Sequence, residues 1–208
     1  MNYPAWYNIK EISRGGYVKA CEGIYEVVEG RNKSKSEEDP FIKAVIIGNV
    51  GLSDSDFKKT EDARLKQKAL EMKMGDFHEE LMGKFQGWET LPNGHSSGFD
   101  VRKLDNSTFL EVKNRHNTVK GSDGKHIIER MQHYKANGKK VILVQVNCPK
   151  GKVSRYGAAA DVPIMNGTEA YEYLSGRKTF FDDLLKTVQY TFTTYKTLAS
   201  LKTALGIA

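Results

Sequence analysis

The sequence predicts an α/β protein with a mixed central sheet flanked by helices. Two apolar segments on either side of a polar turn at 104–107 are typical of a β-hairpin. A helical pattern over 126–136 follows the hairpin, and a near-continuous apolar run over 141–147 follows that helix. Such a run is typical of a strand buried on both faces in a parallel or mixed sheet. An amphipathic helix before the hairpin completes the order helix, strand, strand, helix, strand.

The 208 residues suffice for one well-buried domain. We expect its core at about 75–148, with helical additions at 1–74 and 168–208. In the first addition a helix is predicted over 5–29, interrupted near its glycine pair. Pro40 marks a second helix start after a polar loop.

Charged residues with Ser and Asp N-caps predict a helix over 53–73, followed by a separate amphipathic helix over 75–88. The buried stripe of that amphipathic helix consists of Phe77, Leu81, Phe85 and Trp88. Glu80 lies on the flank of the stripe and can lean towards the hairpin, whereas Glu79 should face solvent. His78 is interpreted as a surface or a packing residue.

The hairpin brings two acidic residues together. Asp105 and Asn106 are expected at the centre of its turn, because Asp-Asn is favourable there. Antiparallel pairing then places Asp100 directly opposite Glu111. Side chains alternate along a strand, so Lys113 shares the face of Glu111.

Like charges in opposite positions destabilise a hairpin, and a divalent cation between Asp100 and Glu111 would explain their pairing. Two carboxylates and an ammonium on one face suit a metal ion beside a scissile phosphate. The alternative is a solvent-facing ion pair with Lys113. The semi-buried character of both strands favours the metal site, because unpaired buried carboxylates are costly.

The polar, basic loop after the hairpin is a candidate for DNA contacts, since Arg and Lys pair with phosphates and Asn and Arg recognise base edges. A solvated connector is the equally weighted alternative. The candidates are Asn114, Arg115, His116, Asn117, Thr118, Lys120 and Lys125.

The later elements follow from helical and strand patterns. The helix over 126–136 closes at Asn137-Gly138 in the manner of a left-handed cap. An edge strand is expected around 162–165, a short helix over 168–174 and a long helical run over 178–205.

Composition bounds the partners and the compartment. A net charge of +6 and a pI near 9.1 are compatible with a polyanionic partner. Two cysteines make no disulfide framework, no window is apolar enough to span a bilayer, and no signal peptide is recognisable, so we expect a cytoplasmic protein. Five scattered histidines offer no zinc-ligand spacing.

The hairpin motif resembles that of the PD-(D/E)xK nuclease superfamily. Asp100 matches its first acid, Glu111 the D/E position, Val112 the x and Lys113 the lysine. Phe99 replaces the usual proline. A longer resemblance, to type II restriction endonucleases that cut GGNCC-type sites, rests on the segments 75–80, 87–88, 99–100 and 111–118.

The resemblance implies a restriction-endonuclease-like fold and Mg²⁺-dependent, sequence-specific cleavage of double-stranded DNA that leaves 5′ phosphates. Asp100, Glu111 and a backbone carbonyl near Val112 would hold Mg²⁺, and Lys113 would stabilise the transition state. Glu80 is the candidate for the extra acid that several members supply from the preceding helix.

The resemblance further implies a homodimer that matches the twofold symmetry of its DNA site. One alternative is a repair or junction-resolving nuclease on the same fold. Another is a DNA-binding protein without catalysis.

Overall fold

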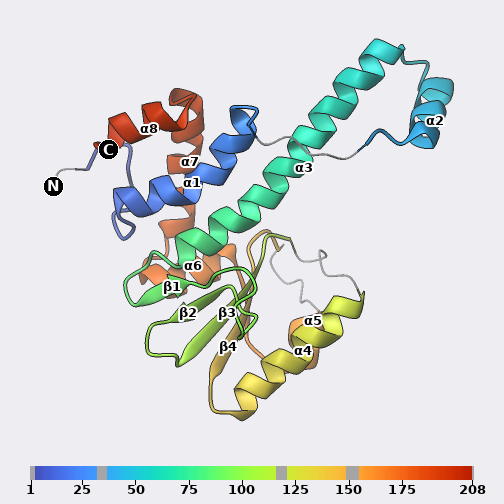
Figure 1. The fold of residues 1–208 in the computed structure, drawn as a ribbon. Helices are drawn as coiled ribbons and strands as arrows, with labels where there is room; N and C mark the ends of the chain where they lie inside the picture. The colour runs from blue at the N-terminus through green and yellow to red at the C-terminus, as the bar shows by residue number, and fades with distance from the viewer. Residues whose placement is uncertain (1–2, 32–36, 116–120, 149–154, 208) are drawn as a thin grey trace.

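A five-stranded mixed sheet with helices on both faces forms the centre of the molecule (Figure 1). The structure is a computed structural model, and it describes residues 3–31, 37–115, 121–148 and 155–207. The strands lie in the order β1-β2-β3-β4-β5, so chain order equals spatial order. The predicted fold class is confirmed. Their bounds are β1 Trp88–Thr90, β2 Val101–Lys103, β3 Thr108–Lys113, β4 Lys140–Gln145 and β5 Ile164–Asn166.

The helices are α1 Arg14–Val28, α2 Pro40–Val50, α3 Asp54–Met82, α4 Gly121–Ala136, α5 Arg155–Ala160, α6 Gly167–Ser175, α7 Phe180–Thr194 and α8 Leu198–Leu205.

The β2–β3 hairpin has the predicted register. Val101 pairs with Leu110, which places Asp100 opposite Glu111 just beyond the last paired residues. The turn closes one residue earlier than expected, because the Asn106 amide donates to the Lys103 carbonyl at 2.9 Å. Asn106 then adopts a left-handed conformation (φ 57°), which Asn tolerates better than most residues.

Strands β3, β4 and β5 are parallel, and α4 makes the crossover from β3 to β4. Their carboxyl ends meet at one edge of the sheet, where Lys113 pairs with Gln145. The predicted edge strand is confirmed as β5, which pairs only with β4. β1 was missed, because Trp88 looked like the end of a helix.

Two apolar clusters cover the two faces of the sheet. α1, α3, α6, α7 and α8 gather on one face, and α4 with α5 on the other (Figure 1). Val112 and Val144 face the first cluster, whereas Phe109 and Leu143 face the second. The alternation along β3 therefore turns Glu111 and Lys113 towards the α4 face.

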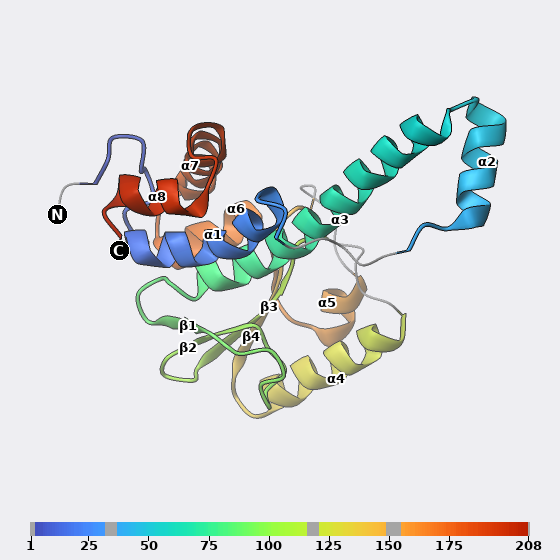
Figure 2. The same cartoon turned by 45° about the horizontal axis from the view of Figure 1, so that its top comes forward.

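The helix predicted over 53–73 and the first part of the helix predicted over 75–88 form one continuous helix, α3, of 29 residues, which ends at Met82. Gly75 does not break it, since a single helical glycine costs only about 1 kcal/mol. Figure 2 shows the first half of α3 and all of α2 projecting from the body of the protein. The second half of α3 packs on the sheet. α3 therefore carries residues of its C-terminal turns to the hairpin.

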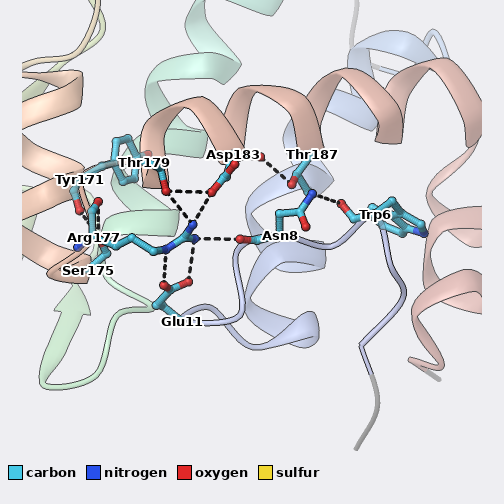
Figure 3. Close-up of polar contacts among 9 residues, drawn as sticks. All are labelled: Trp6, Asn8, Glu11, Tyr171, Ser175, Arg177, Thr179, Asp183 and Thr187. Atoms are coloured by element: carbon cyan, nitrogen blue, oxygen red, sulfur yellow. Dashed lines mark hydrogen bonds and ion pairs between the residues drawn. The ribbon is translucent and has the colours of Figure 1, made fainter.

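The first helix begins later than predicted, at Arg14, and the long run over 178–205 is divided into α7 and α8. Arg177 ties the chain before α1 to the start of α7 (Figure 3). Its guanidinium pairs with Glu11 at 2.7 Å and with Asp183, and it donates to the Asn8 carbonyl at 2.8 Å. The segment before α1 is thus fixed by side chains rather than by helical periodicity.

His78 is a packing residue, buried beneath α6, where its Nδ1 lies 2.8 Å from the Tyr171 hydroxyl. Burial lowers the pKa of His78 to about 4. A lowered histidine pKa means that the folded state resists protonation. Stability is therefore complete above the unfolded pKa of about 6.5 and falls as the pH drops from there towards 4, by up to about 3 kcal/mol.

We expect the free energy of unfolding of His78→Gln to depend less on pH than that of wild type, in urea unfolding measured between pH 4 and 7. His126→Gln is the matched control, because the His126 side chain is 80% exposed. Equal acid slopes in wild type and His78→Gln would contradict the burial argument.

Candidate active site

The carboxyl end of β3, the residue before β2 and the C-terminal half of α3 bring charged side chains together. An open groove of about 420 Å³ lies beside them. Its lining includes Glu71, Asp76 and Glu79 from α3, and Val112 and Lys113 from β3. The site therefore lies at a sheet edge flanked by a helix, in a recess open to a large ligand.

Asp100 is held towards β3 by the Val112 amide, which donates to its Oδ2 at 2.7 Å. Desolvation by burial raises the pKa of Asp100, and the Glu111 carboxylate raises it further. Lys113 and the Val112 amide oppose this rise. The net pKa of Asp100 is raised, so Lys113 and the Val112 amide only partly offset the cost of an ionised carboxylate at this position.

Glu111 is the most deeply buried of the acids, with 4% of its side chain exposed. Its Oε1 lies 2.8 Å from Lys113 Nζ, and its Oε2 accepts from Arg130 Nη2 on α4. Two cations thus hold one carboxylate, as a buried charge requires.

Lys113 joins both acids, since its Nζ also lies 3.8 Å from Asp100 Oδ2. Burial lowers the pKa of Lys113, but the Glu111 and Asp100 carboxylates raise it by more, so the net change is upward. The side chain is therefore a protonated ammonium at neutral pH. The structure brings Asp100, Glu111 and Lys113 together as the hairpin pattern predicted.

Glu79, not Glu80, is the α3 acid that faces this cluster. Desolvation by burial raises the pKa of Glu79 to about 8, with a further rise from Asp100. Glu80 instead forms an ion pair with Lys84 at 2.6 Å. The predicted orientations of the two residues were therefore wrong, because the buried face of α3 also includes His78 and Met82, which brings it closer to Glu79.

The donor set suits a hard divalent cation. Burial raises the pKa values of Asp100 and Glu79, and neighbouring carboxylates raise them further, so a bound cation would stabilise their ionised forms. Mg²⁺ needs only one or two carboxylates and keeps several waters. In the described part of the chain, no three His, Cys, Asp or Glu side chains already converge on one point. The carboxylate oxygens of Asp100 and Glu111 with the Val112 carbonyl are the atoms that could hold such a cation, and Glu79 lies on α3 near enough to Asp100 to affect its charge.

The predicted DNA-contacting residues are only partly described. Asn114 and Arg115 lie at the groove, where Asn114 Nδ2 donates to the Glu71 carbonyl and Arg115 pairs with Glu71 Oε1 at 2.7 Å. Lys125 is exposed on α4 near Glu129. His116, Asn117, Thr118 and Lys120 lie outside the described residues.

Arg130 was not predicted as a site residue. It lies in a helix that the sequence identifies only by its apolar stripe, and a single arginine beside such a stripe does not indicate a functional site. The helical spacing of Arg130, Met131 and Tyr134 placed this part of α4 against the sheet, which was the available hint.

A mixed sheet with acids and a lysine at the edge of its central hairpin is the arrangement of restriction-endonuclease-like nucleases. Residues 26–196 match the Eco47II restriction endonuclease family, and the chain belongs to this family. The predicted relationship to type II restriction endonucleases is confirmed.

Two curated relatives are similar to the chain. It is 35% identical over 118 residues to the type II restriction enzyme Sau96I of Staphylococcus aureus, covering 57% of this chain and 43% of that enzyme. It is 24% identical over 151 residues to the type II restriction enzyme Eco47II of Escherichia coli, covering 64% and 62%. The matches thus span about half the length of these relatives. No solved structure matches significantly.

Proposed function

We propose that the protein is a type II restriction endonuclease that cleaves double-stranded DNA of a GGNCC-type sequence with Mg²⁺, leaving 5′ phosphates. Family membership supports the reaction class. The observation that carries the proposal is the meeting of Asp100, Glu111 and Lys113 at one edge of the sheet. Because DNA is the proposed substrate, we place the protein in the cytoplasm. In the described part of the chain, no helix has the length and apolar character needed to cross a bilayer.

A bound Mg²⁺ would polarise the scissile phosphate and lower the pKa of a water. Asp100 and Glu111 supply the carboxylates that hold such a cation, and the Val112 amide fixes the direction of Asp100. Lys113 Nζ orients the attacking water and stabilises the negative charge that develops on the phosphate oxygens. Its raised pKa keeps it charged for this role.

Glu79 takes the part of the extra acid that was assigned to Glu80. We expect Glu79→Gln to lower the cleavage rate by about 10- to 100-fold at saturating Mg²⁺, because a ligand or water-positioning carboxylate is lost. Glu80→Gln, on the next residue of the same helix, should lose less than about threefold, because its carboxylate faces Lys84. Single-turnover cleavage rates of the two variants test this prediction. A larger loss in Glu80→Gln than in Glu79→Gln would contradict the role given to Glu79.

A homodimer is proposed because twofold proteins match twofold DNA sites. Three apolar side chains of α2 that are exposed to solvent support self-association, since apolar side chains are often buried where proteins meet. Phe41 is 81%, Val45 65% and Val50 63% exposed. Light scattering should give twice the monomer mass, and a monomer that cuts both strands would refute this part.

The proposal as a whole is tested by incubating the protein with a mixed-sequence plasmid and either Mg²⁺ or EDTA. Discrete fragments with Mg²⁺ alone are expected. A smear would indicate a nonspecific nuclease, and cleavage confined to junctions or mismatches would favour a repair enzyme on the same fold. Salt-sensitive binding without nicking would indicate a DNA-binding protein.

A further inference from the structure

Arg130 on α4 occupies a site shaped for its guanidinium. The group lies over the Phe99 ring, with Cζ 5.0 Å from the ring centroid. Phe99 is itself fixed by edge contacts with Tyr134 and a tilted contact with Phe109. A Cβ atom added to Gly98 would come within 2.7 Å of Arg130 Nη1, so only glycine leaves room for the arginine here. Gly98 also has a positive φ of 70°, which favours glycine.

Within this cluster the Arg130 guanidinium contacts the Glu111 carboxylate. Its Nη2 donates to Glu111 Oε2, and only 25% of the side chain is exposed. Nε is buried and has no hydrogen-bond partner among the described residues. A buried donor atom without a partner costs stability, so the ion pair with Glu111 has to outweigh that cost.

The two oxygens of Glu111 are thereby given different partners. Oε2 is directed to Arg130, while Oε1 faces Lys113 Nζ, which also lies near Asp100. Oε1 is thus the oxygen directed to Lys113, the residue of the cluster that lines the groove.

We infer that Arg130 is a positioning residue that fixes the Glu111 carboxylate so that one oxygen alone is offered to the metal, an inference that rests on the proposed nuclease function. Arg130 also places a positive charge next to the metal position. It therefore weakens metal binding while it improves the geometry for catalysis.

Arg130→Met separates these two effects. Without the competing charge, Mn²⁺ alone should bind roughly tenfold more tightly, as followed by the loss of the free Mn²⁺ signal in electron paramagnetic resonance. Without the restraint, kcat should fall by about 30- to 100-fold, with the KM for DNA changed by less than about threefold. Arg130→Lys keeps the charge but not the fork, so its Mn²⁺ affinity should stay near wild type while kcat remains reduced.

Lys135→Met is the matched control, because it removes a positive charge from the same helix that pairs with the exposed Asp161. It should leave both Mn²⁺ affinity and kcat unchanged. Unchanged or weaker Mn²⁺ affinity in Arg130→Met overturns the inference. So does weaker DNA binding with normal kcat, which would make Arg130 a phosphate contact.

A double-mutant cycle without metal tests the restraint independently of activity. Arg130→Met should raise the equilibrium constant of unfolding at least roughly tenfold, because the buried Glu111 carboxylate loses a partner. Adding Glu111→Gln should reverse most of this increase, because the buried charge is then removed. Absence of coupling overturns the inference. A wild-type chain that neither binds Mn²⁺ nor cuts DNA overturns the proposed function instead, while this cycle still shows whether Arg130 holds Glu111.

Discussion

Lys113→Ala is expected to lower the rate of DNA cleavage about 10³-fold while DNA binding stays within a few-fold of wild type. The ammonium acts on charge that develops only in the transition state, so its loss affects the chemical step rather than binding. Glu111 keeps its second partner, Arg130, in this variant, so the buried carboxylate is not left alone. Single-turnover cleavage and DNA-binding titrations measure the two effects separately.

Lys103→Ala is the control for this variant. Lys103 belongs to the same hairpin but lies at its turn, where it pairs with Asp105 at 3.0 Å. It should cut DNA at the wild-type rate. Full activity in Lys113→Ala would eliminate the proposed role of the lysine, and equal losses in both variants would indicate damage to the hairpin instead.

Asp100→Asn is expected to abolish metal-dependent cleavage and, at the same time, to stabilise the metal-free protein by about 1 to 2 kcal/mol at neutral pH. Burial and the nearby Glu111 raise the pKa of Asp100, so the ionised carboxylate costs stability above its folded pKa. This cost shrinks as the pH falls and the group is protonated. An asparagine oxygen can still accept from the Val112 amide, so the local backbone contact is kept.

Urea unfolding with and without Mg²⁺ tests this prediction. Wild type should gain stability from Mg²⁺ and Asp100→Asn should not, because the ligand that binds the cation is lost. Asp182→Asn, an exposed acid in the first turn of α7, is the control and should behave as wild type. A destabilised metal-free Asp100→Asn would show that the carboxylate serves structure rather than metal binding.

The hairpin was predictable because its information is local. The turn residues and the alternation of apolar and polar positions determine a register, and one register brings Asp100 opposite Glu111. The apolar run of β4 was equally informative, since few structures bury both faces of a segment. These two features were sufficient to predict the core of the fold and the proximity of Asp100, Glu111 and Lys113.

The remaining differences come from tertiary contacts that a helical period cannot reveal. Trp88 has helical spacing from Phe85, yet it begins β1 because the chain turns at Gly87 (φ 84°). The inferred stripe also left out His78 and Met82, which are buried in α3, and this omission exchanged the roles of Glu79 and Glu80. Arg130 was missed for a related reason, because a charged residue near an apolar stripe looks the same whether it reaches solvent or a buried carboxylate.

The proposed nuclease requires Asp100 and Glu111 to hold a divalent cation beside Lys113. The most direct measurement is the anomalous scattering of a crystal of this protein soaked in Mn²⁺. A peak is expected within ligand distance of carboxylate oxygens of Asp100 and Glu111, about 2 to 2.5 Å away. A well-soaked crystal whose Mn²⁺ peaks all lie elsewhere, with these carboxylates turned apart, would contradict it.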